Sequence, residues 1–490
     1  MERILFRMIL VLLVVFFAYL YLWVPYVTAV NGGGDVVFTL DDSYIHLAFA
    51  RTLAQSGTFG IRPGEPVGGS TSPLWTFWLA PAFWLPISPE LWMAAWSMLF
   101  TFATFYLLYR LSVMIGVTRL FSLCLVAAYG AYYSTYLSTQ SGMEIPMTTA
   151  AMLLLFLVLE RGGSNIVLGI LIAALGLLRP EFYLLGVLVF LYLIINKRLT
   201  WTFFPVPMVT LVPYHLWLWS VNGFPLPTTY FAKVPSVITR QSPMEYFAAF
   251  SAFLFQHAGL LTILVPAGLY LLLRRKVWIS GAWVCSMVAW SSLSGKSGLW
   301  TPTYLGNFGR YAMIVIPILF LAGFLVLSRG FESGGRTLRR WIIPASTGLI
   351  LVLIFMTVPM SLAHYRKSVE DMRMGDIRVA RWAAANLPRD AVLVVHDLGA
   401  MAYYAPQRLL DLVGIASPEA LAYRRQGRLV SFIDDRKPDY LIFIKDWGGF
   451  LGSRLKEFPP VMIFKVPNTI IFSSDEIWVC RTPWTRGDGP

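Results

Sequence analysis

Long apolar runs separated by short polar stretches dominate the first 365 positions of this chain. Several runs reach the roughly 20 residues that an α-helix needs to cross the hydrocarbon core of a bilayer. The pattern predicts a polytopic α-helical membrane protein with about eleven spans. The predicted spans are Met8 to Val30, Pro89 to Tyr109, Leu120 to Leu137, Glu144 to Leu159, Ile166 to Leu178, Phe182 to Ile195, Trp201 to Trp219, Tyr246 to Leu273, Val277 to Leu293, Tyr311 to Leu327 and Trp341 to Leu362.

Basic side chains between these runs indicate the orientation of the protein. Clusters such as Arg274 to Lys276 are typical of cytoplasmic loops, which predicts a cytoplasmic N-terminus and an uncleaved first span. A signal peptide ending near Val30 is the alternative for that span. The apolar, Trp-rich segment Pro73 to Ile87 is predicted to lie on the outer leaflet. The segments predicted outside are Asn31 to Ser72, Ser138 to Met143, Ser220 to Glu245, Ser294 to Arg310 and His364 to Pro490.

The pattern changes near Arg366, where charge density rises and short alternating runs replace the long apolar ones. We predict a transmembrane module over residues 1–365, with an outer loop at 31–88, and an extracytoplasmic α/β domain over 366–490. Within that domain, Ile377 to Leu387 is predicted to be a helix. The predicted strands are Ala391 to Val395, Leu409 to Val413, Tyr440 to Ile444, Val461 to Val466 and Ile477 to Cys480.

Composition supports the membrane class. Apolar residues make up 57% of the chain and charged residues 13%, about half the share usual in soluble domains. The net charge of +13 does not indicate nucleic-acid binding, because the basic residues fall in short clusters between apolar runs. Cys124, Cys285 and Cys480 have no paired spacing that would indicate a disulfide framework or a metal site.

The adjacent acids Asp41 and Asp42 open a helical pattern just outside the first predicted span. A structural interpretation is available, because Asp is favoured at helix N-termini. The functional alternative is that an acid at the membrane surface removes a proton from a hydroxyl while cations hold an anionic leaving group.

This region also resembles a known family. Asp41-Asp42-Ser-Tyr-Ile, followed by Pro63-Gly64-Glu65-Pro66-Val67, is similar to the first outer loop of C-type (GT-C) glycosyltransferases that use polyprenyl-phosphate sugars. Bacterial terminal arabinofuranosyltransferases and their uncharacterised relatives are the most similar members. Further similarities are Ser141 to Glu144, Arg179-Pro180-Glu181, Pro227 to Lys233, Arg310-Tyr311 and Val395 to Ala400.

The resemblance implies an inverting, one-step transfer with Asp41 as the general base and Asp42 as a residue that orients it or assists a metal. It implies that Arg179, Lys233 and Arg310 bind the donor phosphate. For Lys233 the alternative is snorkelling at the interface. Arg179 lies between two apolar runs, where an arginine usually faces a partner or a cavity. For Glu181 the alternative to a functional role is a structural salt bridge with Arg179.

The remaining predicted site residues are polar or aromatic members of the same motifs. His396 and Asp397 follow a predicted strand, where ligand sites of α/β sheets often lie, although a lone histidine is more often a packed residue. Glu144 has the alternative of being only a helix N-terminal acid. The residues predicted to bind substrate are Tyr44, His46, Glu65, Glu144, Glu181, Tyr230, His396 and Asp397.

We therefore expect a glycosyltransferase of the plasma (inner) membrane that moves a sugar from a polyprenyl-phosphate donor to a glycan, lipid or protein acceptor on the outer face. Arabinofuranose is the first expectation for the sugar, and mannose or another hexose the second. No cofactor is required by the sequence, and a divalent cation, Mg²⁺ or Mn²⁺, is an option without a ligand pattern that compels it. The alternatives are a transporter or flippase of a lipid-linked glycan, and a non-catalytic scaffold.

Overall fold

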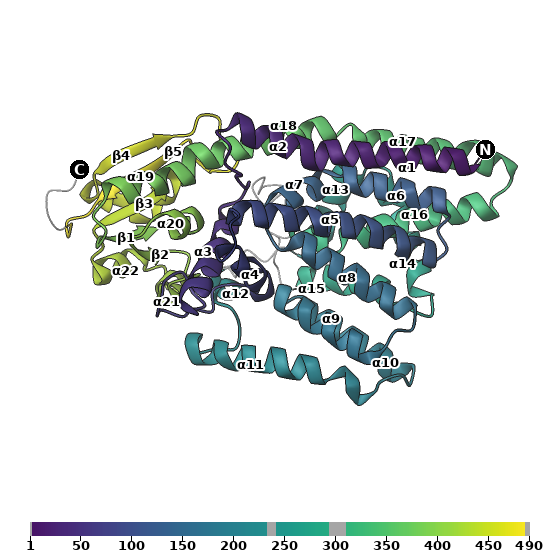
Figure 1. The fold of residues 1–490 in the computed structure, drawn as a ribbon, viewed down its shortest axis with the longest axis horizontal. Coiled ribbons are helices and arrows are strands. Elements are labelled where there is room, and N and C mark those ends of the chain that lie inside the picture. The colour runs from purple at the N-terminus through teal and green to yellow at the C-terminus, as the bar shows by residue number, and fades with distance from the viewer. Residues whose placement is uncertain (1, 233–241, 294–309, 486–490) are drawn as a thin grey trace. The chain divides into compact units, whose positions relative to one another are not determined.

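The computed structural model of the chain describes residues 2–232, 242–293 and 310–485 (Figure 1). The chain divides into two compact units, each built from three separate stretches of sequence. The first unit contains residues 1–35, 94–211 and 239–363. The second contains residues 36–93, 212–238 and 364–490, so the tail shares a unit with most of the predicted first outer loop. The predicted domain boundary at residue 366 stays a prediction.

The first unit is helical. An uninterrupted N-terminal helix is formed by α1 (Glu2–Ala18), η1 (Tyr19–Trp23) and α2 (Val24–Asn31). The helices that follow in this unit, three of which extend in sequence into the second, are α5 (Pro89–Met114), α6 (Arg119–Ala131), α7 (Tyr133–Gln140), α8 (Ile145–Glu160), α9 (Asn165–Leu178), α10 (Phe182–Ile195), η3 (Trp201–Phe203), α11 (Pro205–Asn222), α13 (Pro243–Ala258), α14 (Leu261–Leu273), α15 (Ile279–Leu293), η6 (Arg310–Ile314), α16 (Ile316–Ser333), η7 (Leu338–Ile342), α17 (Ile343–Phe355) and α18 (Val358–Met372).

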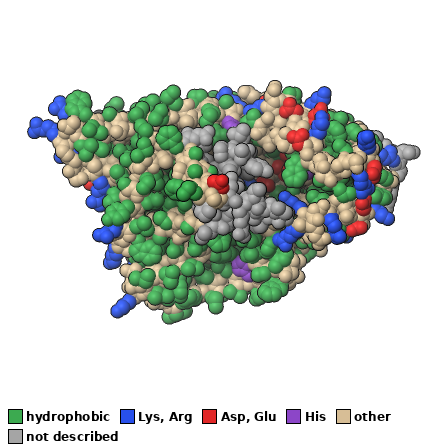
Figure 2. All heavy atoms as spheres, turned by 180° about the vertical axis from the view of Figure 1, so that it is seen from behind, with side chains coloured by type: hydrophobic (Ala, Val, Ile, Leu, Met, Phe, Trp, Pro, Cys, Tyr) green, Lys and Arg blue, Asp and Glu red, His purple; other side chains and the backbone are tan. Residues whose placement is uncertain are grey.

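Membrane-spanning potential is clear for part of this set. In the described residues, four helices are long and apolar enough to cross a bilayer, or five if the bent pair of α6 and α7 is one span. Phe6–Asn31 is the most apolar of them. Exposed Val14, Val15, Met208 and Val209 place apolar side chains on outward faces, and Figure 2 shows extended hydrophobic areas on the surface. The protein is thus a helical membrane protein, while the predicted count of eleven spans is not confirmed.

Several predicted spans are interrupted. The run Leu120 to Leu137 forms α6 and α7 with a bend of 57°, because Tyr132 between them has extended backbone angles. The prediction of one helix from Tyr246 to Leu273 is wrong. Gly259 has a φ of +54° and ends α13, and α14 begins at Leu261. Glycine accepts this conformation without the steric penalty of a Cβ atom, so an apolar run alone did not reveal the break.

The second unit combines short helices with a sheet. Its helices are α3 (Asp41–Ser56), α4 (Pro73–Leu79), η2 (Ala80–Phe83), α12 (Thr228–Ala232), η8 (Arg373–Ile377), α19 (Arg378–Asn386), α20 (Gly399–Tyr404), α21 (Pro418–Arg425), α22 (Leu429–Arg436) and η9 (Lys445–Glu457). Its strands are β1 (Val392–Val395), β2 (Arg408–Asp411), β3 (Tyr440–Ile444), β4 (Pro460–Lys465) and β5 (Glu476–Arg481). The five predicted strands and the predicted helix before them are confirmed, with ends shifted by one or two residues.

The sheet has the order β2-β1-β3-β5-β4. The first three strands are parallel, with Val394 opposite both Leu410 and Leu441. The other two are antiparallel, and Leu441 lies opposite Cys480. β2 pairs with one side of β1, and β3 pairs with the other. The loop after β1 and the loop after β3 therefore lie near each other at the carboxyl end of β1.

The core of the sheet is apolar and nearly inaccessible. Val394, Leu441 and Cys480 pack with Phe432 and Ile433 of α22. Their burial explains why these strands appear in the sequence as short, nearly continuous apolar runs. In the same unit, the predicted interfacial segment forms α4 and η2 with Trp75 and Leu79 fully buried; its position at a bilayer surface stays a prediction.

Candidate active site

Asp41 is the first residue of α3, and its carboxyl group contacts a different helix. Leu40 before it is extended, so the helix begins where the sequence predicts. Oδ2 of Asp41 accepts a hydrogen bond from the amide of Gly399 at 2.6 Å, and Oδ1 accepts one from the amide of Ala400 at 2.7 Å. These are the first two amides of α20, which have no acceptor within their own helix. Asp41 thus caps a helix 358 residues further along the chain.

The environment of Asp41 disfavours its ionised form. Burial raises the pKa of this carboxyl from 3.8 to about 7, and the negative charges of Asp397 and Asp42 act in the same direction. The amides of Ala400 and Gly399 lower the pKa, because they stabilise the carboxylate. Burial and like charge therefore outweigh two charge-assisted hydrogen bonds. The outcome is a carboxyl group that changes protonation near neutral pH.

A third acid, Asp376, belongs to this group. It lies in η8, and only 7% of its surface is exposed. Burial raises the pKa of Asp376 well above its usual value, and the charges of Asp397 and Asp41 raise it further. Gly375, whose φ of −96° and ψ of −109° are not helical, immediately precedes it. The sequence analysis missed Asp376; the only available signal was an isolated acid beside a glycine in an otherwise helical stretch.

His396 and Asp397 follow β1 directly, at the carboxyl end of the parallel strands. Nδ1 of His396 lies 3.1 Å from Oδ1 of Asp397. The imidazole packs on the indole ring of Trp447, with centroids 3.6 Å apart, and Trp447 comes shortly after β3. The structure thus brings together loops that follow two neighbouring strands, as the strand order requires. Asp397 is also the residue through which this loop acts on Asp41.

Four other predicted substrate contacts have different surroundings. Tyr44 is fully buried, with its ring near those of Tyr403 and Tyr404. Nδ1 of His46 lies 3.3 Å from the hydroxyl of Thr76, inside the same unit. The other two residues are Glu65, which is exposed and 4.0 Å from Arg62, and Tyr230, which is half-buried with its ring against Phe231. A role of these four in substrate binding stays a prediction.

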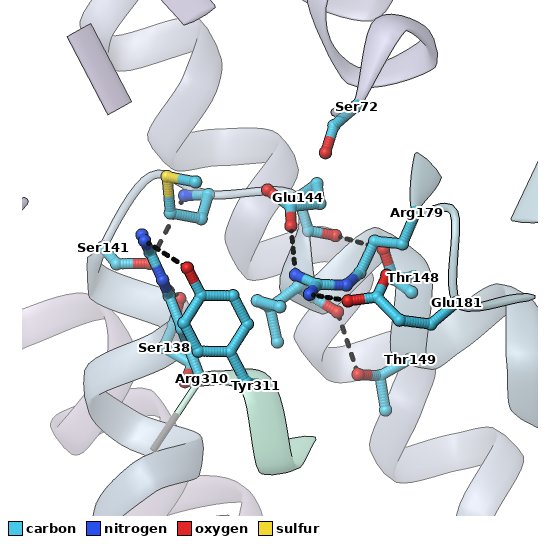
Figure 3. Close-up of polar contacts among 12 residues, drawn as sticks. Ser72, Ser138, Ser141, Glu144, Thr148, Thr149, Arg179, Glu181, Arg310 and Tyr311 are labelled. Atoms are coloured by element: carbon cyan, nitrogen blue, oxygen red, sulfur yellow. Dashed lines mark hydrogen bonds and ion pairs between the residues drawn. The ribbon is translucent and has the colours of Figure 1, made fainter. Parts of the chain in front are cut away.

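In the first unit, Arg179 lies between two glutamates (Figure 3). Its guanidinium donates to Glu144 at 2.7 Å and to Glu181 at 2.8 Å, and both Arg179 and Glu144 are buried. Each charge lies at a helix end where the helix dipole favours its sign. Arg179 follows α9, while Glu144 and Glu181 precede α8 and α10. One arginine and two carboxylates give a net charge of −1, which disfavours an additional anion.

Arg310 lies on the other side of a shared aromatic ring. The guanidinium carbons of Arg179 and Arg310 lie 5.2 and 5.0 Å from the ring centroid of Tyr311 (Figure 3). Arg310 is 4% exposed and donates to the hydroxyl of Tyr311 at 3.1 Å. The third predicted phosphate ligand, Lys233, lies outside the described residues. The roles of Arg179, Arg310 and Lys233 in binding the donor phosphate stay predictions.

The described residues contain no group of three histidine, cysteine or acidic side chains arranged to hold a metal ion. Asp41, Asp376 and Asp397 are close enough to interact electrostatically, yet the two oxygens of Asp41 face backbone amides. A divalent cation at this site stays a prediction.

Comparison with known proteins was made for the tail and for the whole chain. A family model described as a domain of unknown function, DUF8728, matches residues 363–479. No curated protein matches the chain.

Solved structures match over nearly the full length. The crystal structure of ArnT from Cupriavidus metallidurans bound to undecaprenyl phosphate aligns with a TM-score of 0.60 and 14% identity, covering 97% of this chain and 99% of that one. An oligosaccharyltransferase from Archaeoglobus fulgidus, tethered to an acceptor peptide, aligns with a TM-score of 0.58 and 11% identity, covering 95% and 73%. The chain therefore shares the fold of these structures, which is the GT-C fold that the sequence resemblance implied.

Proposed function

We propose that this protein is a membrane glycosyltransferase that moves a sugar from a polyprenyl-phosphate donor to an acceptor hydroxyl on the extracytoplasmic face, with Asp41 as general base. The shared fold supports the class, since one structure with this fold holds undecaprenyl phosphate and another is an oligosaccharyltransferase. The observation that supports the mechanism best is the Asp41 carboxyl, whose pKa of about 7 suits a base at neutral pH.

The proposed reaction is a single displacement. The acceptor hydroxyl donates a hydrogen bond to the free lone pair of an Asp41 oxygen and transfers its proton there. As that O–H bond breaks, the acceptor oxygen forms a bond to the anomeric carbon. The bond from that carbon to the phosphate oxygen breaks, and polyprenyl phosphate leaves with the electron pair. Attack opposite the leaving group inverts the anomeric centre. Asp42 adds negative charge beside the base.

The leaving phosphate needs positive charge rather than a proton donor. Arg310 is the proposed phosphate ligand among the described residues, because its guanidinium faces an aromatic ring and a hydroxyl. Lys233 is proposed on the motif alone. Arg179 is proposed in a supporting role, since Glu144 and Glu181 already balance its charge. The transporter alternative gains no support from Arg179, Glu144 and Glu181, because these charges are paired with one another.

The sugar is proposed as arabinofuranose first and mannose or another hexose second, on sequence resemblance. The test is transfer from a panel of radiolabelled polyprenyl-phosphate sugars to crude cell-envelope acceptors by the purified protein. Wild type should transfer one donor, and Asp41→Asn should reduce that rate by roughly 10²–10⁴-fold, the usual contribution of a general base. Asp390→Asn, at an exposed acid in the same unit, is the matched control and should keep full activity.

Thermal unfolding of each variant in detergent must accompany the assay, because Asp41 also caps α20. A folded Asp41→Asn protein that transfers at the wild-type rate would exclude Asp41 as the base. Absence of transfer by wild type from every polyprenyl-phosphate donor in the panel would count against the proposed donor class.

A further inference from the structure

Helix α20 is held at its second end by another residue of α3. The guanidinium of Arg51 donates through Nη1 to the carbonyl of Tyr403 at 2.5 Å and through Nη2 to the carbonyl of Ala402 at 2.9 Å. Its central carbon also lies 5.5 Å from the ring centroid of Tyr403. The last carbonyls of a helix have no donor within the helix, so a two-pronged cation is well suited to them.

Asp41 and Arg51 therefore form hydrogen bonds with opposite ends of α20. The acid accepts from the first amides of α20, and the base donates to its last carbonyls, so each charge has the sign that the helix dipole favours. Ten residues of helix separate Asp41 from Arg51, a rise of roughly 15 Å. The two contacts fix both the position of α20 along α3 and its direction.

The N-terminus of α20 packs closely against Asp41. A Cβ atom on Gly399 would collide with the backbone carbonyl of Asp41 and lie 2.8 Å from its Oδ2. Glycine is thus required at the point where the two helices meet. A small displacement of α20 would consequently change the two hydrogen bonds to the Asp41 carboxylate directly.

We propose that Arg51 is a positioning residue for Asp41, which fixes the far end of α20 so that the amides of Gly399 and Ala400 stay on the carboxylate. The inference rests on the proposed function, because it assigns to Arg51 the control of the base in that reaction. Arg51 donates to the carbonyls at the far end of α20 and not to Asp41 itself. It acts through six residues of helix.

The charge of Arg51 does not explain such an effect by itself. It is not among the charges that shift the pKa of Asp41, which are those of Asp397 and Asp42. The ionisable groups that face Asp41 are Asp42 and Tyr44 on its own helix, Asp397 in the loop after β1, and Asp376 in η8. The helical segments α4 and η2, which also pack against α3, contribute no charged side chain.

The test compares Arg51→Gln and Arg51→Lys with wild type in the transfer assay across pH 5.5 to 9. Loss of the amide contacts raises the pKa of Asp41, because those contacts stabilise its ionised form. Arg51→Gln should therefore reduce kcat/KM at pH 6 by roughly tenfold, as expected for a weakened hydrogen bond to a charged group, and change it little at pH 8.5. Arg51→Lys, which keeps one donor group, should fall between the two.

Arg424→Gln is the matched control. Arg424 also donates to two backbone carbonyls of the second unit, those of Ala232 and Val413, and does not contact α20. It should lower stability comparably without moving the acid limb of the pH profile. Hydrogen–deuterium exchange of the peptide containing Gly399 and Ala400 gives a readout independent of activity. Exchange there should be faster in Arg51→Gln and unchanged in Arg424→Gln.

The outcomes separate this inference from the proposed function. A loss of rate that is equal at all pH values, or unchanged exchange at Gly399 and Ala400, overturns the positioning role while the transferase assignment stands. If wild type transfers no sugar, the proposed function fails. The exchange experiment then still decides whether Arg51 holds α20 in place. Faster exchange in Arg51→Gln supports that role, and unchanged exchange rejects it.

Discussion

Two groups of charged side chains, one in each unit, differ in how their charges are stabilised. Around Arg179, opposite charges meet directly, and each lies at the helix end that favours its sign. Around Asp41, like charges gather, and backbone amides rather than a basic side chain hold the carboxylate. The first arrangement pairs its arginine with two carboxylates and has a net charge of −1. The second leaves a carboxyl group whose pKa is raised to about 7.

This difference in how the charges are held indicates which group is the more reactive. A buried ion pair loses much stability when one partner is removed, because the other charge remains without compensation. A carboxyl group held by amides among other acids changes protonation easily instead, which is what proton transfer requires. Under the proposed function, the Arg179 group is structural with a secondary role at the donor, and the Asp41 group is the chemical centre.

The largest expected effect breaks the first group. Arg179→Gln removes the cation that lies 2.7 Å from the carboxylate of Glu144, which is 2% exposed. We expect a loss of about 3–5 kcal/mol in the free energy of unfolding, measured by denaturant titration in detergent. Arg62→Gln, which removes a 4.0 Å surface pair with Glu65, is the control and should cost no more than about 1 kcal/mol.

A second substitution tests whether the loss of stability comes from the buried carboxylate. Glu144→Gln added to Arg179→Gln removes the buried carboxylate that Arg179 faces in the wild type and should recover part of the lost stability. If the single Arg179 variant proves as stable as Arg62→Gln, the comparison between the two groups fails, and Arg179 becomes a stronger candidate for direct donor binding.

Next in size is the contact between α3 and α20. Gly399→Ala places a methyl group against the backbone of Asp41, and overpacking of this kind costs about 1–3 kcal/mol. Transfer should fall with it, because the amide contacts to the base are displaced. Gly449→Ala meets no atom within 4 Å and should change stability by less than about 0.5 kcal/mol. Equal stability and activity for both variants would contradict the close approach at Gly399.

Much of this architecture follows from local patterns, and the site only in part. The start of α3 at Asp41 and the five strands of the tail were predictable, because helix termini and apolar runs depend on neighbouring residues. The partners of Asp41 and Arg51 were not, since they lie more than 350 residues away and depend on the tertiary fold. Asp376 had only a weak local signal, an isolated acid beside Gly375, and the break at Gly259 was hidden inside an apolar run.

The pH dependence of transfer distinguishes the two groups without any mutation. Below pH 7 the Asp41 carboxyl is protonated and cannot accept the proton of the acceptor hydroxyl, and above it the carboxyl is ionised. We expect kcat/KM to rise with pH along a limb with its midpoint near 7 and a slope of one proton. A limb near pH 4 would indicate an ordinary carboxylate and remove the physical argument for Asp41.

The smallest expected effects concern the neighbours of the base. Asp397→Asn and Asp42→Asn each remove a negative charge that raises the pKa of Asp41, so each should move the acid limb to lower pH. The shift should be larger for Asp397→Asn, because Asp397 is the stronger of the two charges acting on Asp41. Glu181→Gln, in the other unit, should leave the limb where it is. The order of the two shifts tests the geometry, because Asp42 is adjacent in sequence while Asp397 is brought close only by the fold; a larger shift for Asp42→Asn would mean that the loop after β1 does not face the base.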